Sequence, residues 1–169
     1  MKEWVVGRNP VYEVLRAGRR DVFRVLVAKG VDEKRHLADA LDMSAQQSIP
    51  VSRVERDRLD HLHENHQGVA AEIGPYPYTS ITDIFDLAES RDESPFLLIL
   101  DTVQDPRNLG TLLRTAEVVG VHGVLLPLRR TATVTPAVVT TSSGASEHML
   151  IAQANLARTI QEIKEIGVW

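Results

Sequence analysis

Asn108 and Arg114 are the residues best placed to do chemistry in this chain, an amide and a cation on one expected helix. The apolar run Phe96–Leu100 has no polar alternation, which predicts a strand buried on both faces. A polar loop (101–107) follows, and we expect Asn108 to cap the next helix. Arg114 lies on that helix, roughly opposite its apolar face. In open α/β sheets, ligands bind where such a loop meets a helix N-terminus.

Each of these residues also has a purely structural interpretation. Asp105-Pro106 is a common turn dipeptide, Asn108 could serve only as a helix cap, and Arg114 could be an ordinary solvated side chain. The apolar face that should pack on the sheet comprises Leu109, Leu112, Leu113, Ala116 and Val119.

Several familiar sites are not supported by the sequence. It has no GxxxxGKS/T phosphate loop and no GxGxxG motif after a strand. His61, His63 and His66 are close in sequence, but no cysteine is near them and a helix-to-loop transition is expected between them, so we expect no metal site. Ser142-Ser143-Gly144 lacks the strand–turn–helix setting of a hydrolase nucleophile.

Composition indicates a globular protein of one ordinary domain or two small ones. The 169 residues are 43% hydrophobic and 25% charged, with no cysteine and no apolar run long enough to span a membrane. The first residues lack the apolar core of a signal peptide, so we expect a cytoplasmic protein. The net charge of −4 argues against binding nucleic acid by bulk charge, yet residues 1–35 hold nine Lys/Arg against five acids. This excess predicts a local basic patch at Arg16, Arg19, Arg20 and Arg24.

The first 78 residues predict a small α/β sandwich. Asn9-Pro10 is typical of a helix start, with Asn9 as the cap, and Gly18 can end that helix. Further helices are expected from Asp32 through Leu41 and over 57–62, and strands over 22–28, 49–54 and 69–73.

Residues 79–95 are expected to be a linker with a brief helix at 82–88. The alternation restarts in 96–169, with strands at 96–100, 121–127 and 148–152 and helices after each. Asn155 is expected to cap the last helix and Gly167 to close it, with Val168-Trp169 opening a fourth strand. Three such units predict half of a doubly wound parallel sheet with right-handed crossovers.

Two long stretches resemble one family. LILDTVQDPRNLGTLLRTAEVVGVHGVLLP and SSGASEHMLIAQANLARTIQEIKEIGVW are similar to segments of the SpoU branch of the SPOUT (α/β knot) RNA methyltransferases. GRNPVYEVLRAG and HQGVAAEI resemble the start and end of the ribosomal-protein-like substrate-binding domain of bacterial ribosomal-RNA members.

The resemblance implies methyl transfer from S-adenosylmethionine to a ribose 2′-hydroxyl of structured RNA, ribosomal more than transfer RNA, by a homodimer. Arg114 matches the family arginine at the reacting hydroxyl, and Asn108 matches an asparagine of the catalytic loop. Arginine is a poor free base, because its pKa exceeds about 12, so orienting the hydroxyl and stabilising alkoxide charge is the preferred role. We expect RNA contacts from Arg16, Arg19, Arg20, His66, Gln67, Arg107, Arg129 and Arg130.

The family's cofactor pocket belongs to a C-terminal knot, whose residues would follow Trp169. We therefore expect a truncated chain that has no cofactor-binding residue of its own, is inactive alone and self-associates through its uncovered sheet. The alternative is a non-catalytic RNA-binding module. The presence of both Asn108 and Arg114 argues against it, since a pure binder would not need both.

Overall fold

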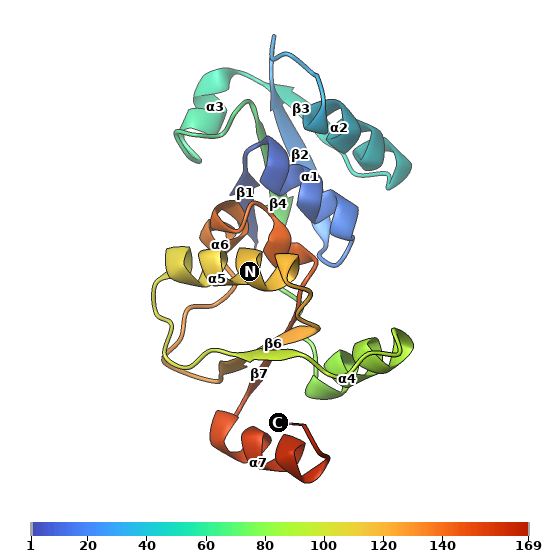
Figure 1. Ribbon diagram of the computed structural model, residues 1–169. Coiled ribbons are helices and arrows are strands. Elements are labelled where there is room, and N and C mark those ends of the chain that lie inside the picture. The colour runs from blue at the N-terminus through green and yellow to red at the C-terminus, as the bar shows by residue number, and fades with distance from the viewer. Residues whose placement is uncertain (1, 169) are drawn as a thin grey trace.

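The computed structural model describes residues 2–168, which fold around two sheets (Figure 1). The first sheet has the order β1-β4-β2-β3, with β4 antiparallel to both neighbours and β2 parallel to β3. Its strands are β1 (Glu3–Val6), β2 (Val22–Ala28), β3 (Val51–Val54) and β4 (Val69–Ile73). The ranges expected for β2 and β4 are confirmed. Strand β1 was not expected, since it is only four residues long and ends just before Gly7.

Helices cover both faces of this sheet, because alternate strand residues point to opposite sides. On one face, α1 (Arg8–Ala17) and α2 (His36–Gln46) pack against Val25, Val27 and Ala71. On the other face, Leu59 of α3 (Arg56–Asp60) packs with Leu26 and Ala70.

Two expected helix starts in this unit are wrong. Helix α1 is preceded by Gly7 at φ 98°, so Asn9 lies inside the helix and is not its cap. Helix α2 begins at His36 and not at Asp32, because the chain turns through Arg35 at φ 53° first. The expected helix end at Gly18 is confirmed, with Gly18 in the left-handed conformation at φ 60°.

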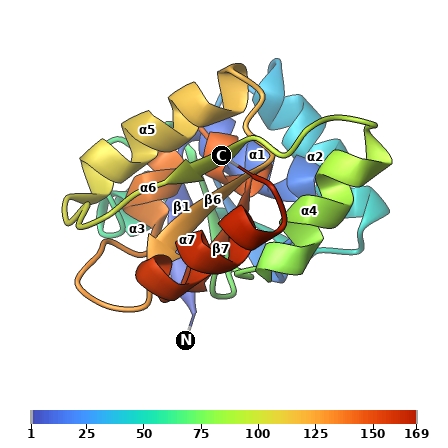
Figure 2. The same ribbon diagram turned by 60° about the horizontal axis from the view of Figure 1, so that its bottom comes forward.

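The second sheet is wholly parallel, as the sequence predicted, and its strands have the order β5-β6-β7. Its strands are β5 (Leu97–Ile99), β6 (Gly123–Pro127) and β7 (Leu150–Ala154). Helix α5 (Pro106–Val118) lies on one side of the sheet, and α4 (Ile81–Ser90) and α7 (Leu156–Glu165) lie on the other (Figure 2). Residues 79–95, which the sequence suggested as a linker, contain α4, whose Ile84 is buried against Leu125 and Ala152.

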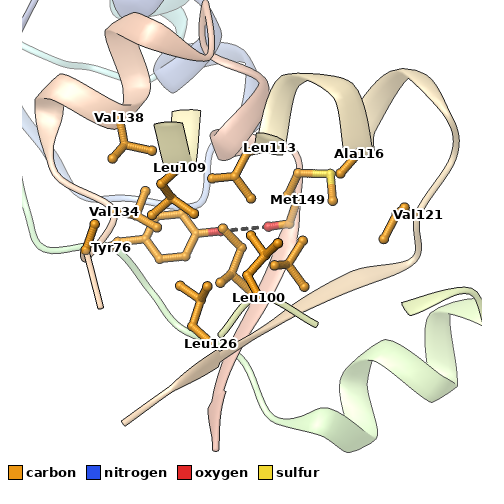
Figure 3. Packing of buried hydrophobic residues seen from close by; sticks show 13 residues of the cluster. Tyr76, Leu100, Leu109, Leu113, Ala116, Val121, Leu126, Val134, Val138 and Met149 are labelled. Atoms are coloured by element: carbon orange, nitrogen blue, oxygen red, sulfur yellow. Dashed lines mark hydrogen bonds between the residues drawn. The ribbon is translucent and has the colours of Figure 1, made fainter. Parts of the chain in front are cut away.

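The main core of this unit lies between α5 and the sheet (Figure 3). Leu109, Leu113 and Ala116 are buried on the helix, whereas Leu112 and Val119 are 37% and 55% exposed. The expected apolar face is therefore only partly correct. The difference arises because Gly110 is buried against α6, so the buried face of α5 is rotated toward Gly110 and away from Leu112.

Three other expectations for this unit need correction. Strand β5 is only partly buried, not buried on both faces, because among the described residues it is an edge strand that pairs with β6 alone. Phe96, the residue just before it, is 51% exposed. Helix α5 is capped by Asp105, whose side chain accepts from the Arg107 amide, and Asn108 lies within the helix. Asn155 caps α7 as expected. Val168 is not in a strand, and Trp169 lies outside the described residues.

Helix α6 (Pro136–Thr141) and the short 3-10 helix at Ala145–Glu147 join the two units. Val139 of α6 is completely buried in the core of the first sheet, although α6 also packs along α5. The two sheets therefore share a continuous interior. No helix within residues 2–168 has the length and apolarity needed to cross a membrane.

Candidate functional site

The C-terminal ends of β5 and β6 carry neighbouring loops. The Ala132 amide donates to the Val103 carbonyl at 2.7 Å, and the Thr131 hydroxyl donates to the same oxygen at 3.0 Å. The exposed cations Arg107, Arg129 and Arg130 lie in or beside these two loops. The structure thus gathers these three predicted residues at the edge of a parallel sheet where ligands commonly bind.

Arg114 lies farther along α5, in an exposed hollow of about 330 Å³. It makes no salt bridge within residues 2–168. Glu13 and Arg16 of α1 line the same hollow, as do Ser143 and His148 after α6. Both units therefore contribute to the surroundings of Arg114. Asn108 is also exposed but does not line this hollow.

Two close backbone approaches build the hollow. A Cβ atom on Gly110 would lie 2.7 Å from the Cβ of Thr141, so only glycine lets α5 and α6 pack this closely. Gly144 adopts φ 88°, and a Cβ there would lie 2.4 Å from Glu13. The turn after α6 can therefore touch α1 only with glycine at this position.

A pair of polar side chains bridges the units beside Arg114. Nε2 of His148 lies 2.6 Å from Oε2 of Glu13, and Nη1 of Arg16 lies 3.7 Å from the same oxygen. Glu13 therefore partly neutralises Arg16, whereas Arg114 makes no salt bridge within residues 2–168 and keeps its charge available for a ligand.

A buried ion pair lies behind this surface. Arg20 donates from Nε to Oε2 of Glu147 at 2.9 Å and from Nη2 to Oε1 at 2.8 Å. The two side chains are 0% and 1% exposed. Arg19 adds hydrogen bonds to the Met149 and Pro77 carbonyls and to the Tyr76 hydroxyl.

Tyr76 lies at the centre of this contact. Its hydroxyl donates to the Met149 carbonyl at 2.7 Å (Figure 3), and the Arg20 guanidinium lies 4.9 Å from its ring centroid. Burial raises the pKa of Tyr76 to about 12, although the nearby Arg19 cation opposes the shift. The phenol therefore stays protonated and holds its hydrogen bond throughout the neutral range.

The sequence predicted an exposed basic patch at Arg16, Arg19, Arg20 and Arg24, and this prediction is wrong. Arg20 is buried against Glu147, Arg19 is engaged across the unit boundary, and Arg24 pairs with Glu72 at 2.8 Å. Only Arg16 of the four remains largely exposed. Charge counting failed because the carboxylates that pair with Arg20 and Arg24, and the carbonyls that accept from Arg19, lie far away in sequence.

The two residues expected to contact RNA in the turn at 66–68 differ in exposure. His66 is completely buried, with Nε2 2.9 Å from Oδ1 of Asp60 and Nδ1 accepting from the Gly68 amide, so its expected RNA contact is wrong. Gln67 is exposed, and its Oε1 accepts from the Arg8 amide at the start of α1. Arg8 was not singled out from the sequence, since nothing there places it beside residue 67.

Comparison with known proteins agrees with these observations. A family model described as "RNA 2'-O ribose methyltransferase substrate binding" matches residues 4–79, and the "SpoU rRNA Methylase family" model matches residues 95–169. The Bacillus subtilis protein YacO, which bears the name of a TrmH-family tRNA/rRNA methyltransferase, is 38% identical over 99% of this chain and 67% of its own length. The chain belongs to the SpoU family.

Other SpoU relatives are longer than this chain. A Mycobacterium marinum protein named as a tRNA/rRNA methyltransferase is 42% identical over 98% of this chain and 54% of its own length. The SpoU methyltransferase AviRb from Streptomyces viridochromogenes, solved in complex with AdoMet, has a TM-score of 0.72 at 17% identity and is covered over 60% of its length. An AdoMet-bound rRNA methyltransferase from Sinorhizobium meliloti has a TM-score of 0.70 at 22% identity, covered over 57%. The chain thus spans about half to two thirds of these proteins.

Proposed function

We propose that the protein to which this chain belongs transfers a methyl group from S-adenosylmethionine to a ribose 2′-hydroxyl of structured RNA. The observation that carries the proposal is the placement of Arg114, an exposed cation without an ion pair among the described residues, in a hollow shared by both units. SpoU membership and the AdoMet-bound structural neighbours support the reaction class and the cofactor.

Arg114 is suited to the hydroxyl and not to the cofactor. A 2′-hydroxyl is poorly acidic, so its oxygen needs orientation and charge stabilisation as the proton leaves. A guanidinium supplies planar donors for both tasks and remains protonated. We assign Arg114 to this role and Asn108, at the start of the same helix, to organising the loop before it.

The hollow at Arg114 does not fit the cofactor by itself. The hollow at Arg114 is open and lined by charged groups such as Glu13, Arg16 and Glu117, without the enclosed apolar walls that hold an adenosine. We therefore assign no residue within 2–168 to S-adenosylmethionine.

For RNA contacts we propose the exposed residues Arg16, Gln67, Arg107, Arg129 and Arg130. Ribosomal RNA is the proposed substrate in preference to transfer RNA, because the matching family is described by rRNA. A homodimer and a cytoplasmic location complete the proposal.

The test is methyl transfer by the whole protein from labelled S-adenosylmethionine to unmodified ribosomal and transfer RNA, followed by nucleoside analysis. We expect label in a 2′-O-methylated nucleoside of ribosomal RNA. Label on a base would contradict the proposed reaction. RNA binding without any transfer would favour a non-catalytic module.

A further inference from the structure

A second and larger cleft lies at the boundary between the two units. It has a volume of about 610 Å³ and is formed where α1 begins, where α2 begins and where α6 ends. Arg8, Lys34 and Arg35 line one side, and Thr140 and Ser143 line the other. Some of its polar groups are engaged with one another, since Nε of Arg8 donates to the Gln67 carbonyl at 3.3 Å. Within residues 2–168 the side chains of Lys34 and Arg35 make no hydrogen bond to the second unit, so they face the cleft without a partner across it.

The lining of this cleft carries positive charge and no carboxylate. Among the described residues, Arg8 and Arg35 form no salt bridge, and Lys34 contacts only Asp32 at 3.1 Å. Both side chains of that pair are more than half exposed, and such pairs contribute little. Three cations around a concave surface favour an anionic ligand such as a phosphate.

An aromatic ring is held in place in the same cleft. His36 stacks on Tyr12 with ring centroids 4.7 Å apart and an interplanar angle of 9°. Its Nδ1 lies 2.5 Å from Oδ1 of Asn9, which fixes the ring against rotation. Proteins that bind unpaired nucleotides combine cations for the backbone with fixed rings for the bases.

The cleft also leads to the candidate active site. Ser143 lines both the cleft and the hollow that contains Arg114, so the two depressions meet at this residue. A linear ligand could therefore lie in both at once, with one part beside Arg35 and another beside Arg114.

We propose that this cleft binds the RNA nucleotides that flank the target ribose. Arg8, Lys34 and Arg35 contact backbone phosphates, His36 contacts a base, and the strand passes Ser143 to reach Arg114. This inference rests on the proposed function, since it takes RNA as the substrate. It adds the position at which the protein holds the RNA strand.

The first experiment measures binding of an unmodified, fluorescently labelled ribosomal RNA hairpin to the 169-residue chain at several salt concentrations. We expect the Lys34→Glu/Arg35→Glu variant to bind about tenfold more weakly and to lower the salt slope by about two. The matched control is Arg56→Glu/Arg58→Glu, which makes the same charge change on exposed residues of α3. Equal losses in the two variants would overturn the proposed cleft.

The second experiment locates the RNA directly. The chain contains no cysteine, so Thr140→Cys places a single photo-crosslinker in the cleft, and Thr82→Cys places one on an exposed position of α4, on the side of the second sheet opposite α5. We expect RNA crosslinks from position 140 only. Crosslinks equal at both positions, or absent from 140, would contradict the proposal while leaving methyl transfer intact. Wild-type protein that binds no RNA would overturn the proposed function as well.

Discussion

Arg20 and Glu147 form a two-pronged ion pair between the first and second units, 127 residues apart in sequence and almost completely shielded from water. Nη1 of Arg20 is the single buried side-chain polar atom within residues 2–168 without a hydrogen-bond partner. The pair orients α1 relative to the turn that carries Ser143 and His148. The geometry around Arg114 therefore depends on it.

We expect Arg20→Ala to lower the free energy of unfolding by about 3–5 kcal/mol, because it leaves the Glu147 carboxylate buried without its partner. Replacing both residues by apolar ones of similar volume, Arg20→Met with Glu147→Leu, should recover much of this loss. Denaturant unfolding measures both effects. The control is Arg158→Ala, which breaks an exposed pair with Glu162 and should change stability far less, because water screens that pair. If Arg20→Ala lowered the free energy of unfolding no more than Arg158→Ala does, burial would not explain the contribution of the Arg20–Glu147 pair.

Arg114→Ala should lower methyl transfer by the whole protein about 100- to 1,000-fold, through loss of a contact made in the transition state. Arg114→Lys should also fail, since one ammonium cannot reproduce a planar fork of donors. The melting temperature should not change, because the side chain is exposed and makes no salt bridge within the described chain. Arg56→Ala on α3 serves as the control. Near-normal turnover in either variant would remove Arg114 from the mechanism.

Tyr76 should make the protein sensitive to alkaline pH. The raised pKa means that the folded state keeps the phenolic proton when the unfolded state has lost it, so this contribution to stability is complete below about pH 10 and is lost as the pH rises through about 12. A shift of this size corresponds to about 3 kcal/mol. The Tyr76→Phe variant should be less stable at neutral pH, because it loses the hydrogen bond to Met149, yet should lose less stability between these pH values. The measurement is denaturant unfolding of both proteins between about pH 8 and pH 12. If the free energy of unfolding fell equally with pH in both, Tyr76 would not be the group responsible.

We expect the 169-residue chain to self-associate through its C-terminal half. Most of its exposed large apolar side chains lie there, including Val118 at 77% and Phe96 at 51% exposure. Sedimentation should show dimers or larger species. Val118→Glu combined with Val119→Glu tests the end of α5, and Phe96→Glu tests the edge strand β5. A monomeric wild-type chain at high concentration would contradict this prediction.

The sequence determined the local architecture by itself. Apolar runs bounded by turn residues located strands β2 and β4, and Gly18 and Asn155 marked helix ends, because these signals act within a few residues. The succession of strands and helices also determined a parallel second sheet. The motif around Asn108 and Arg114 pointed to the SpoU family, which the family models confirm.

Only the tertiary structure decided which charged groups are free. Arg16 and Arg20 are equivalent in a count of charges, yet one is exposed and the other is buried against Glu147. His66 likewise has its partners, Asp60 and Gly68, inside the fold. Burial and pairing depend on contacts between distant segments, and neither hydrophobic periodicity nor local charge encodes those contacts. For the same reason, the cleft beside Arg35 and the hollow at Arg114, which share Ser143, exist only where the two units meet.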